Sequence, residues 1–258
     1  MIADSQGVRI AYDVHGDGEP LVLIMGLGYG RWGWEPVVEP LAARYRVITF
    51  DNRGYGDSDA PPGPYTAAQL AGDTLAVLDA VGVDRAHVVG ASLGGAVAQE
   101  LALRHGGRIE KLVLMATMSG ASNMHPIPAP TLALMAEAPT LDPAVAIRRF
   151  VENALEPEPD PPLVDRIVAI RVAKPPDPAG WAAQAAIWAT FDAWAELPRI
   201  EAPTLVVQGE GDVVVDPRNA ALLAERIPGA ELRMVPGGHL FFWNRPDALV
   251  SPLREFLG

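Results

Sequence analysis

The sequence contains no cysteine and only five histidines among its 258 residues. The absence of cysteine excludes disulfide bonds, a thiolate nucleophile and cysteine-ligated metal sites. The histidines stand at neither HxH nor HxxxH spacing, so a zinc site is not expected. The phosphate-binding pattern G-x-x-x-x-G-K-[ST] is also missing. From these observations we expect that the protein needs no metal and no organic cofactor.

Basic residues are scarce beside acidic ones, with 20 Lys and Arg against 32 Asp and Glu and a formal net charge of -12. Binding to nucleic acid depends on neutralising phosphates, so a nucleic-acid partner is not expected. No apolar run approaches the roughly 20 residues that span a bilayer. The first residues also lack a basic segment leading an apolar run, which a signal peptide would need. We therefore expect no membrane association and a cytoplasmic location.

Short, continuous apolar runs are present, and they are rich in β-branched residues. Such runs are typical of strands covered on both faces of a parallel sheet, and five occur: Leu21–Met25, Val47–Phe50, Ala86–Val89, Leu112–Ala116 and Thr204–Val207. A sixth, Glu231–Val235, alternates more and suits an edge strand. Helix-like segments lie between the runs; one begins with a capping box at Thr66 and Gln69 and ends at Gly82. This order predicts an α/β fold with a mostly parallel sheet flanked by helices.

The alternation of strand and helix breaks between Ser119 and Pro198. There the proline clusters PIPAP, EPEPDPP and KPPDP separate helix-like pieces, and no convincing strand occurs. We interpret residues 119–197 as a helical lid inserted over the sheet, and residues 1–118 and 198–258 as one core domain. Toward the end of the insertion, aromatic and small residues recur at a spacing that predicts one helical face: Trp181, Ala185, Trp188 and Asp192.

One serine stands among small residues in VVGASLGGA, between a buried strand and a helix-like segment. The pattern is G-x-S-x-G, with Gly90 and Gly94 two positions on either side of Ser92. A sharp strand-to-helix turn strains the backbone of its middle residue, and the glycines remove side chains that would collide. The hydroxyl is then held at the carboxyl edge of the sheet, where open α/β sheets bind ligands. We predict that Ser92 is a nucleophile and that the amide of Leu93 points toward the group attacked.

A nucleophilic serine needs a base. His239, in VPGGHLFFW, follows the last predicted strand and would return to the carboxyl edge of the sheet. His125 in the insertion is its one serious rival. The remaining histidines fit less well because they lie in an early turn, inside a buried strand and at a helix end: His15, His87 and His105.

The base in turn needs an orienting acid. In LVVQGEGDVVVDP, Asp212 occupies a glycine-rich turn directly after a strand. Glu210 and Asp216 are alternatives, although Asp216 precedes Pro217 and more plausibly caps the following helix. The predicted order of the three groups along the chain is Ser92, Asp212, His239.

These motifs resemble the α/β-hydrolase superfamily over essentially the full chain. LIMGLGYG, FDNRGYGDSD, GASLGG and the GEGD…GGH pair match in order, and serine, acid, histidine is the order of that superfamily's triad. The resemblance implies a lid inserted after the sixth strand and an oxyanion hole formed by the backbone N–H groups of Leu27 and Leu93. Many members have His-Gly before the first of these, where this chain has Met25-Gly26. We interpret Asp51 and Arg53 in the second motif as structural.

The resemblance also bears on the reaction. Haloalkane dehalogenases and epoxide hydrolases have an aspartate where this chain has Ser92, so acyl transfer to the serine and hydrolysis of an ester, lactone or thioester is implied, as in small bacterial carboxylesterases and enol-lactonases. Cofactor-free haloperoxidases and C–C bond hydrolases use the same triad and stay open as alternatives. A hydrolase-fold ligand-binding protein with little turnover is a further alternative.

The substrate is expected to be an apolar small molecule, because the insertion is apolar and aromatic toward its end. We predict that Met118, Trp188 and Phe191 line the pocket. A substrate bearing a carboxylate would instead need a cation there, and the insertion offers four candidates: Arg148, Arg149, Arg166 and Arg171.

Overall fold

The computed structural model describes residues 1–156 and 158–258; Pro157, in the second proline cluster of the predicted lid, lies outside the described residues. Over that range, eight strands form one sheet in the order β1-β2-β4-β3-β5-β6-β7-β8. Their bounds are β1 Ile2–Ser5, β2 Val8–His15, β3 Glu19–Ile24, β4 Tyr45–Phe50, β5 Ala86–Ala91, β6 Ile109–Met115, β7 Thr204–Gly209 and β8 Glu231–Val235. Strands β3 to β8 are parallel, which confirms the predicted fold class.

All six predicted strands are present, and Glu231–Val235 forms the edge strand β8, as predicted. The sequence patterns did not predict β1 and β2. His15, which was expected in a turn, is the last residue of β2. This strand runs antiparallel to β1 and β4 near the other edge, and polar residues interrupt it. It therefore lacks the continuous apolar run of a strand covered on both faces.

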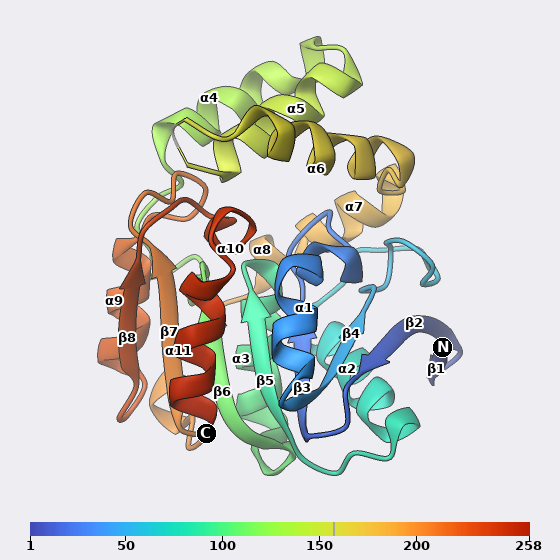
Figure 1. The fold of residues 1–258 in the computed structure, drawn as a ribbon, viewed down its shortest axis with the longest axis vertical. Coiled ribbons are helices and arrows are strands. Elements are labelled where there is room, and N and C mark those ends of the chain that lie inside the picture. Colours follow the sequence, from blue (N-terminus) through green and yellow to red (C-terminus); the bar gives the residue numbers. More distant parts are fainter. Residues whose placement is uncertain (157) are drawn as a thin grey trace.

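The parallel strands carry apolar residues at consecutive positions because the sheet is covered on both sides. Val22 and Ile24 of β3 belong to one buried cluster, whereas Leu21 and Leu23 belong to the other. Successive side chains of a strand point to opposite faces, so each run supplies both clusters at once. Figure 1 shows the sheet between its two helical layers.

The first cluster includes residues of α2 (Ala67–Val81), α3 (Leu93–His105) and α9 (Arg218–Arg226). The second includes residues of α1 (Glu35–Ala42), α10 (Phe241–Asn244) and α11 (Asp247–Leu257), and Figure 1 shows α1 and α11 in front of the strands. The predicted capping box of α2 is confirmed, since Thr66 Oγ1 accepts a hydrogen bond from the Gln69 N–H at 3.2 Å. Short 3-10 turns complete the chain: Arg31–Trp34, Gly106–Arg108, Ala138–Thr140 and Leu197–Arg199.

Between β6 and β7 the described chain is mainly helical, as predicted. It forms α4 (Ala129–Glu137), α5 (Pro143–Ala154), α6 (Pro161–Ala173), α7 (Pro178–Ala185) and α8 (Ile187–Thr190). In Figure 1, α4, α5 and α6 lie as a separate layer above the end of the sheet toward which the β5 arrow points. That end is the carboxyl edge, where a ligand site is expected. The role of this segment as a lid stays a prediction.

The single helical face predicted from Trp181 to Asp192 is wrong. Helix α7 ends at Ala185, α8 ends at Thr190, and Asp192 forms an isolated β-bridge with Gly120. The bridge joins the two ends of the insertion, and it requires extended backbone where a continuous helix would pass.

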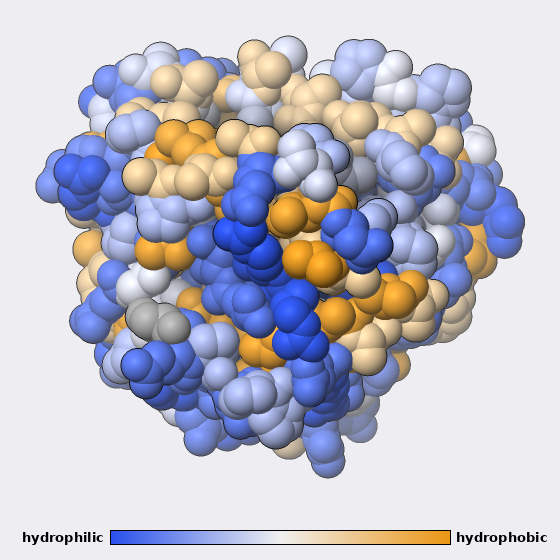
Figure 2. All heavy atoms as spheres, turned by 90° about the horizontal axis from the view of Figure 1, so that it is seen from above, coloured by the Kyte–Doolittle hydropathy of each residue, from blue (hydrophilic) through white to orange (hydrophobic). Residues whose placement is uncertain are grey.

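The view from above shows apolar patches on either side of a hydrophilic band (Figure 2). Large apolar side chains exposed on the insertion are Leu132, Met135, Val145, Val172 and Trp181.

The insertion is fastened to the core near α7. Gln184 Nε2 donates to the carbonyl oxygen of Arg53 at 2.7 Å, and the Tyr65 N–H donates to the carbonyl oxygen of Ala183 at 3.1 Å. Arg53 itself forms a buried bidentate pair with Asp73 of α2, with N···O distances of 2.7 and 2.6 Å. This pair raises the pKa of the Arg53 guanidinium, so the arginine stays charged. The interpretation of Arg53 as structural agrees with these contacts.

We expect Asp73→Asn to destabilise the protein by about 3–5 kcal/mol, because it leaves the buried Arg53 charge uncompensated. Chemical denaturation with a linear extrapolation measures the change. The control is Asp79→Asn in the same helix, where an exposed carboxylate pairs with Arg108 at 2.6 Å and about 1 kcal/mol or less is expected. Equal losses in the two variants would contradict the role assigned to the buried pair.

Candidate active site

Ser92 lies at the turn between β5 and α3 with φ 53° and ψ -118°, a conformation that residues with a side chain rarely adopt. Hydrogen bonds hold the residue in place. Its N–H donates to the carbonyl oxygen of Met115 at 2.9 Å, and its carbonyl oxygen accepts from Thr117 Oγ1 at 2.7 Å and from the Gly95 N–H at 2.8 Å. The predicted strained turn at Ser92 is therefore present, braced by the end of β6 and by the residues that follow it.

The glycines on either side of Ser92 permit close packing of the turn. A Cβ atom on Gly90 would lie 2.3 Å from the carbonyl oxygen of Gly94, and one on Gly94 would lie 2.1 Å from that of Ile24. The loop after β3 approaches from the other side, since a Cβ atom on Gly26 would lie 3.0 Å from Ser92 Cβ and 3.5 Å from Ser92 Oγ. Backbone from β3 and α3 thus surrounds the serine.

Asp212 and His239 are brought together although 27 residues separate them. His239 Nδ1 lies 2.8 Å from Asp212 Oδ2, and both residues are buried. Gln208 Nε2 donates to the same carboxylate oxygen at 2.9 Å. Asp212 Oδ1 accepts from the N–H groups of Val214 and Val215 at 2.8 and 2.9 Å. The carboxylate is therefore held in one orientation, which can fix the proton of the imidazole on Nδ1 and leave Nε2 to accept another.

The alternative acid lies elsewhere. Asp216 accepts from the backbone N–H of Arg218 at 3.0 Å and from the Arg218 side chain at 2.9 and 2.6 Å. These hydrogen bonds lower the pKa of Asp216. The contacts agree with the predicted position of Asp216 at the start of α9. Glu210, the other alternative, is exposed to solvent.

The other histidines have different surroundings. The backbone of His125 exchanges hydrogen bonds with the side chain of Asn219, at 2.7 and 3.2 Å. His87 is buried in β5, with Nε2 at 3.2 Å from Glu19 at the opposite end of the strands. Over the described residues, His239 is the histidine that a carboxylate orients at the carboxyl edge.

The Ser92 hydroxyl makes no hydrogen bond to His239 within the described parts of the chain. The two side chains nevertheless belong to the same edge of the sheet, since Ser92 follows β5 and His239 follows β8. Hydrogen bonds between a nucleophile and its base are often long until substrate binds, so the missing hydrogen bond does not exclude His239 as the base. That role stays a prediction.

The insertion holds the loop that carries His239, a feature without a signal in the sequence. The Leu240 N–H donates to the carbonyl oxygen of Ala154 at 2.8 Å. A Cβ atom on Gly238 would lie 2.0 Å from the carbonyl oxygen of Leu155, so only glycine fits there. Glu156 then accepts hydrogen bonds from two side chains of the segment after the loop, Asn244 at 2.8 Å and Arg245 at 2.6 Å. The end of α5 therefore positions the histidine loop.

The two predicted oxyanion donors lie beside Ser92. Leu93 is the first residue of α3, where backbone N–H groups lack partners within the helix and favour negative charge. Leu27 follows Gly26, the residue packed against Ser92, and its side chain is half-buried. Their role as donors stays a prediction that this placement allows.

The role of Met118, Trp188 and Phe191 in lining a pocket stays a prediction, and the structure shows how each of them packs. Phe191 is buried in the same core cluster as α2 and α3, and Trp188 packs on that cluster with its ring centroid 6.3 Å from that of Phe191. Met118 follows β6, and its carbonyl oxygen accepts from Gln99 Nε2 at 3.0 Å. Trp181 instead lies against the loop after β3, with its indole 3.1 Å from the position of a Cβ atom on Gly28.

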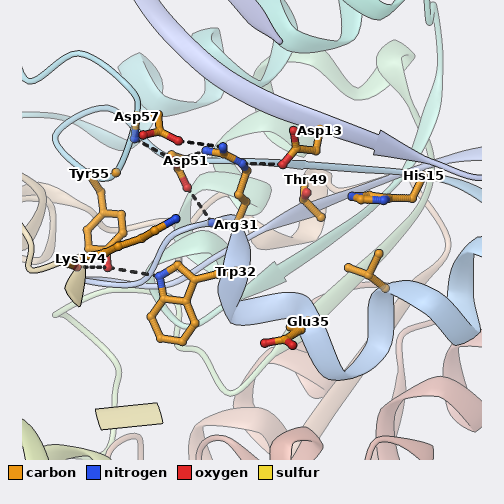
Figure 3. A pocket seen from close by; sticks show the side chains of 12 residues that line it. Asp13, His15, Arg31, Trp32, Glu35, Thr49, Asp51, Tyr55, Asp57 and Lys174 are labelled. Carbon is orange, nitrogen blue, oxygen red and sulfur yellow. Dashed lines mark hydrogen bonds and ion pairs between the residues drawn. The ribbon is translucent and has the colours of Figure 1, made fainter. Parts of the chain in front are cut away.

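A polar cavity of about 300 Å³ lies beside this loop (Figure 3). Its centre is Arg31, which pairs with Asp13 at 2.6 Å, with Asp57 at 2.8 Å and with Asp51. Asp51 also accepts from the N–H groups of Arg31 at 2.7 Å and Asp57 at 3.0 Å, and burial raises the pKa of its carboxyl group. Asp51 thus ties the loop after β3 to the turn after β4, which agrees with its interpretation as structural.

Known proteins of similar sequence share the fold described above. A family model described as the α/β hydrolase fold matches residues 19–246. RutD from Azorhizobium caulinodans, named as a carbamate hydrolase, is 32% identical, with 96% of this chain and 94% of that protein covered. BpoC from Mycobacterium tuberculosis, named as a non-heme bromoperoxidase, is 31% identical, with 96% and 97% covered.

A solved structure extends the comparison to three dimensions. The enol-lactonase from Burkholderia xenovorans LB400 superposes with a TM-score of 0.87 at 30% identity, and the superposition covers 100% of this chain and 99% of that one. The sequence match, the order of the strands in the sheet and the turn at Ser92 all indicate the same fold. The chain therefore belongs to the α/β-hydrolase fold family.

Proposed function

We propose that this protein is a serine hydrolase that cleaves carboxylic esters or lactones. Ser92 is the nucleophile, His239 is the general base and Asp212 orients it. The observation that carries the proposal is the strained Ser92 at the carboxyl edge of the sheet that also bears the hydrogen-bonded Asp212–His239 pair. These are the three roles that acyl transfer to serine requires.

In the proposed reaction, His239 Nε2 takes the proton of Ser92 Oγ as the oxygen attacks the substrate carbonyl carbon. The oxyanion formed accepts hydrogen bonds from the N–H groups of Leu27 and Leu93. The intermediate then expels the alcohol oxygen, which receives the proton from His239, and Ser92 is left acylated. Water, deprotonated by His239, attacks the acyl group, and the second intermediate releases the carboxylic acid and the Ser92 hydroxyl.

The similar proteins support attack on a carbonyl carbon. Their names include a carbamate hydrolase and an enol-lactonase, whose substrates both present such a carbon. The similarity to BpoC keeps peroxide-dependent halide oxidation as a second candidate. We further propose that residues 119–197 act as a lid over the site, because the segment begins just after the carboxyl end of β6 and Asp192, near its other end, forms a β-bridge with Gly120.

The test combines active-site labelling with a substrate panel. A fluorophosphonate should modify Ser92, located by peptide mass spectrometry, and the enzyme should hydrolyse members of a panel of acyl esters, aryl esters and lactones compared by kcat/KM. Halide oxidation by hydrogen peroxide is measured in parallel. Labelling without turnover would indicate a ligand-binding protein, halide oxidation without ester cleavage would favour the second candidate, and no labelling of Ser92 would refute the proposal.

We also expect Trp188 to influence substrate size selectivity. If its indole forms part of the acyl or alcohol pocket with Met118 and Phe191, then Trp188→Ala should shift the ratio of kcat/KM for p-nitrophenyl benzoate and p-nitrophenyl acetate by about tenfold. Phe191→Leu should shift it less, because most of the ring volume is retained. The control is Trp194→Ala, since Trp194 packs against the guanidinium of Arg226 at 5.2 Å. Flat ratios with lowered thermal stability would show that these aromatic residues only pack the insertion.

A further inference from the structure

The four arginines singled out in the insertion differ in their partners. Arg149 pairs with Glu137 at 2.6 Å, Arg148 pairs with Asp165 and Glu152, and Arg166 pairs with Glu35. Over the described residues, Arg171 has no carboxylate within ion-pair distance. Sequence patterns alone do not separate these four, because Glu137, Asp165 and Glu35 lie on other elements than the arginines with which they pair, although Arg148 and Glu152 share α5.

Arg171 instead packs on the loop after β3. Its guanidinium carbon lies 4.5 Å from the ring centroid of Tyr29, and Nη1 donates to the Tyr29 hydroxyl at 3.2 Å. Its Nε is buried and has no hydrogen-bond partner among the described residues. The residue as a whole is only partly buried, and among the described residues no carboxylate pairs with its charge. An anion beside the guanidinium would therefore gain a charge-assisted hydrogen bond.

A second donor converges on the same place. The position of a Cβ atom on Gly28 lies 3.5 Å from Arg171 Nη2 and 3.1 Å from Trp181 Nε1. The two groups come from α6 and α7, and they meet where Gly28 has no side chain. Gly28 is two residues from Gly26, whose backbone packs against Ser92. The two donors therefore flank the loop that borders the proposed nucleophile.

We propose that Arg171 and Trp181 bind an anionic group of the substrate, so that the ester or lactone carries a carboxylate away from the bond that is cleaved. This inference rests on the proposed function and names its substrate class. The guanidinium supplies charge and paired N–H donors, which match a carboxylate, and the indole supplies one further N–H. The sequence led us to expect an uncharged, apolar substrate. The inference changes this expectation to a largely apolar substrate that bears one acidic group.

The test compares matched pairs of substrates. In one pair the carboxylate is on the acyl side, p-nitrophenyl hydrogen glutarate against p-nitrophenyl pentanoate. In the other it is on the leaving group, 4-acetoxybenzoate against p-tolyl acetate. Arg171→Gln should lower kcat/KM for the anionic member of at least one pair by about tenfold or more, and change the neutral member by less than about threefold. Trp181→Phe, which keeps a ring and removes the N–H, should act in the same direction by about threefold.

Two controls separate binding from folding. Arg149→Gln removes a charge from the same insertion where Glu137 already pairs with it, and it should leave both ratios unchanged. Arg171→Lys, which keeps the charge, should recover part of the loss. Equal losses for anionic and neutral substrates in Arg171→Gln, with a lowered melting temperature, would show that Arg171 only packs on Tyr29 and would overturn the inference.

Binding of glutarate, measured by calorimetry, tests the subsite without turnover. Arg171→Gln should weaken glutarate binding by about tenfold. Equal affinities in the unaltered protein and the variant, or no detectable binding to either, would overturn the inference. If neutral esters are hydrolysed and Ser92 is labelled while the ratios stay flat, only the anionic subsite fails. If Ser92 is not labelled and no ester is cleaved, the proposed function fails, whatever glutarate binding shows.

Discussion

Ser92→Ala is expected to lower kcat for a short p-nitrophenyl ester by about four to six orders of magnitude. The variant has no group that can form the acyl-enzyme, so the oxyanion donors and substrate binding alone contribute to the rate. Fluorophosphonate labelling should disappear in the same variant. Single-turnover and steady-state kinetics on p-nitrophenyl acetate measure the loss.

The control for Ser92→Ala is Ser122→Ala, because Ser122 is exposed in the insertion and hydrogen-bonds Asp192 there. It should retain activity within about twofold, as surface changes remote from a site usually do. A Ser92→Ala enzyme that kept more than a tenth of the activity would remove the basis of the proposed function.

Replacing Ser92 by glycine gives a separate readout of backbone strain. Ser92→Gly should be as inactive as Ser92→Ala, because both variants lack the hydroxyl. Glycine also adopts positive φ values without the collision that a Cβ atom causes. Ser92→Gly should therefore be more stable than Ser92→Ala, by about 1 kcal/mol. Equal melting temperatures of the two variants would mean that the turn at φ 53° stores little strain.

Asp212→Asn is expected to lower kcat by about 10⁴-fold, because it favours the wrong tautomer of His239. The N–H groups of Val214 and Val215 would hold the amide oxygen of the asparagine in the place of Oδ1. The amide nitrogen would then occupy the position of Oδ2, facing Gln208 Nε2 and His239 Nδ1. A donor at this position keeps the proton on Nε2, which then cannot accept one from Ser92.

Asp216→Asn is the matched control, since it makes the same change four residues along the chain. Asp216 bonds Arg218 at the start of α9, so its loss should change kcat by less than about threefold. His239→Ala should be about as inactive as Ser92→Ala, because the two groups act as a unit. A severe loss in Asp216→Asn with a mild one in Asp212→Asn would transfer the role of the acid to Asp216.

The sequence by itself determined those features of the protein that depend on neighbouring residues. A parallel strand covered on both faces must be apolar at every position, so β3 to β7 were recognisable from short runs such as Leu21–Met25. The capping box at Thr66 and the glycines around Ser92 are likewise local, because each reflects a backbone conformation set within a few residues. For the same reason β2 was missed, since an antiparallel strand near an edge carries no such run.

The tertiary structure alone decided which distant groups meet. Asp212, Asp216 and Glu210 stand within seven residues. The local pattern favours Asp212, because Asp216 precedes a proline, but only the tertiary structure shows that Asp212 faces His239 and that Asp216 faces Arg218. The partners of Arg148, Arg149 and Arg166 on other elements are likewise set by the tertiary structure. Among the described residues, it leaves Arg171 without a carboxylate within ion-pair distance. Elements far apart in the chain also meet where Ala154 accepts a hydrogen bond from the histidine loop and where Trp181 packs against Gly28. Such contacts depend on the relative position of whole elements, and no short pattern of residues encodes that position.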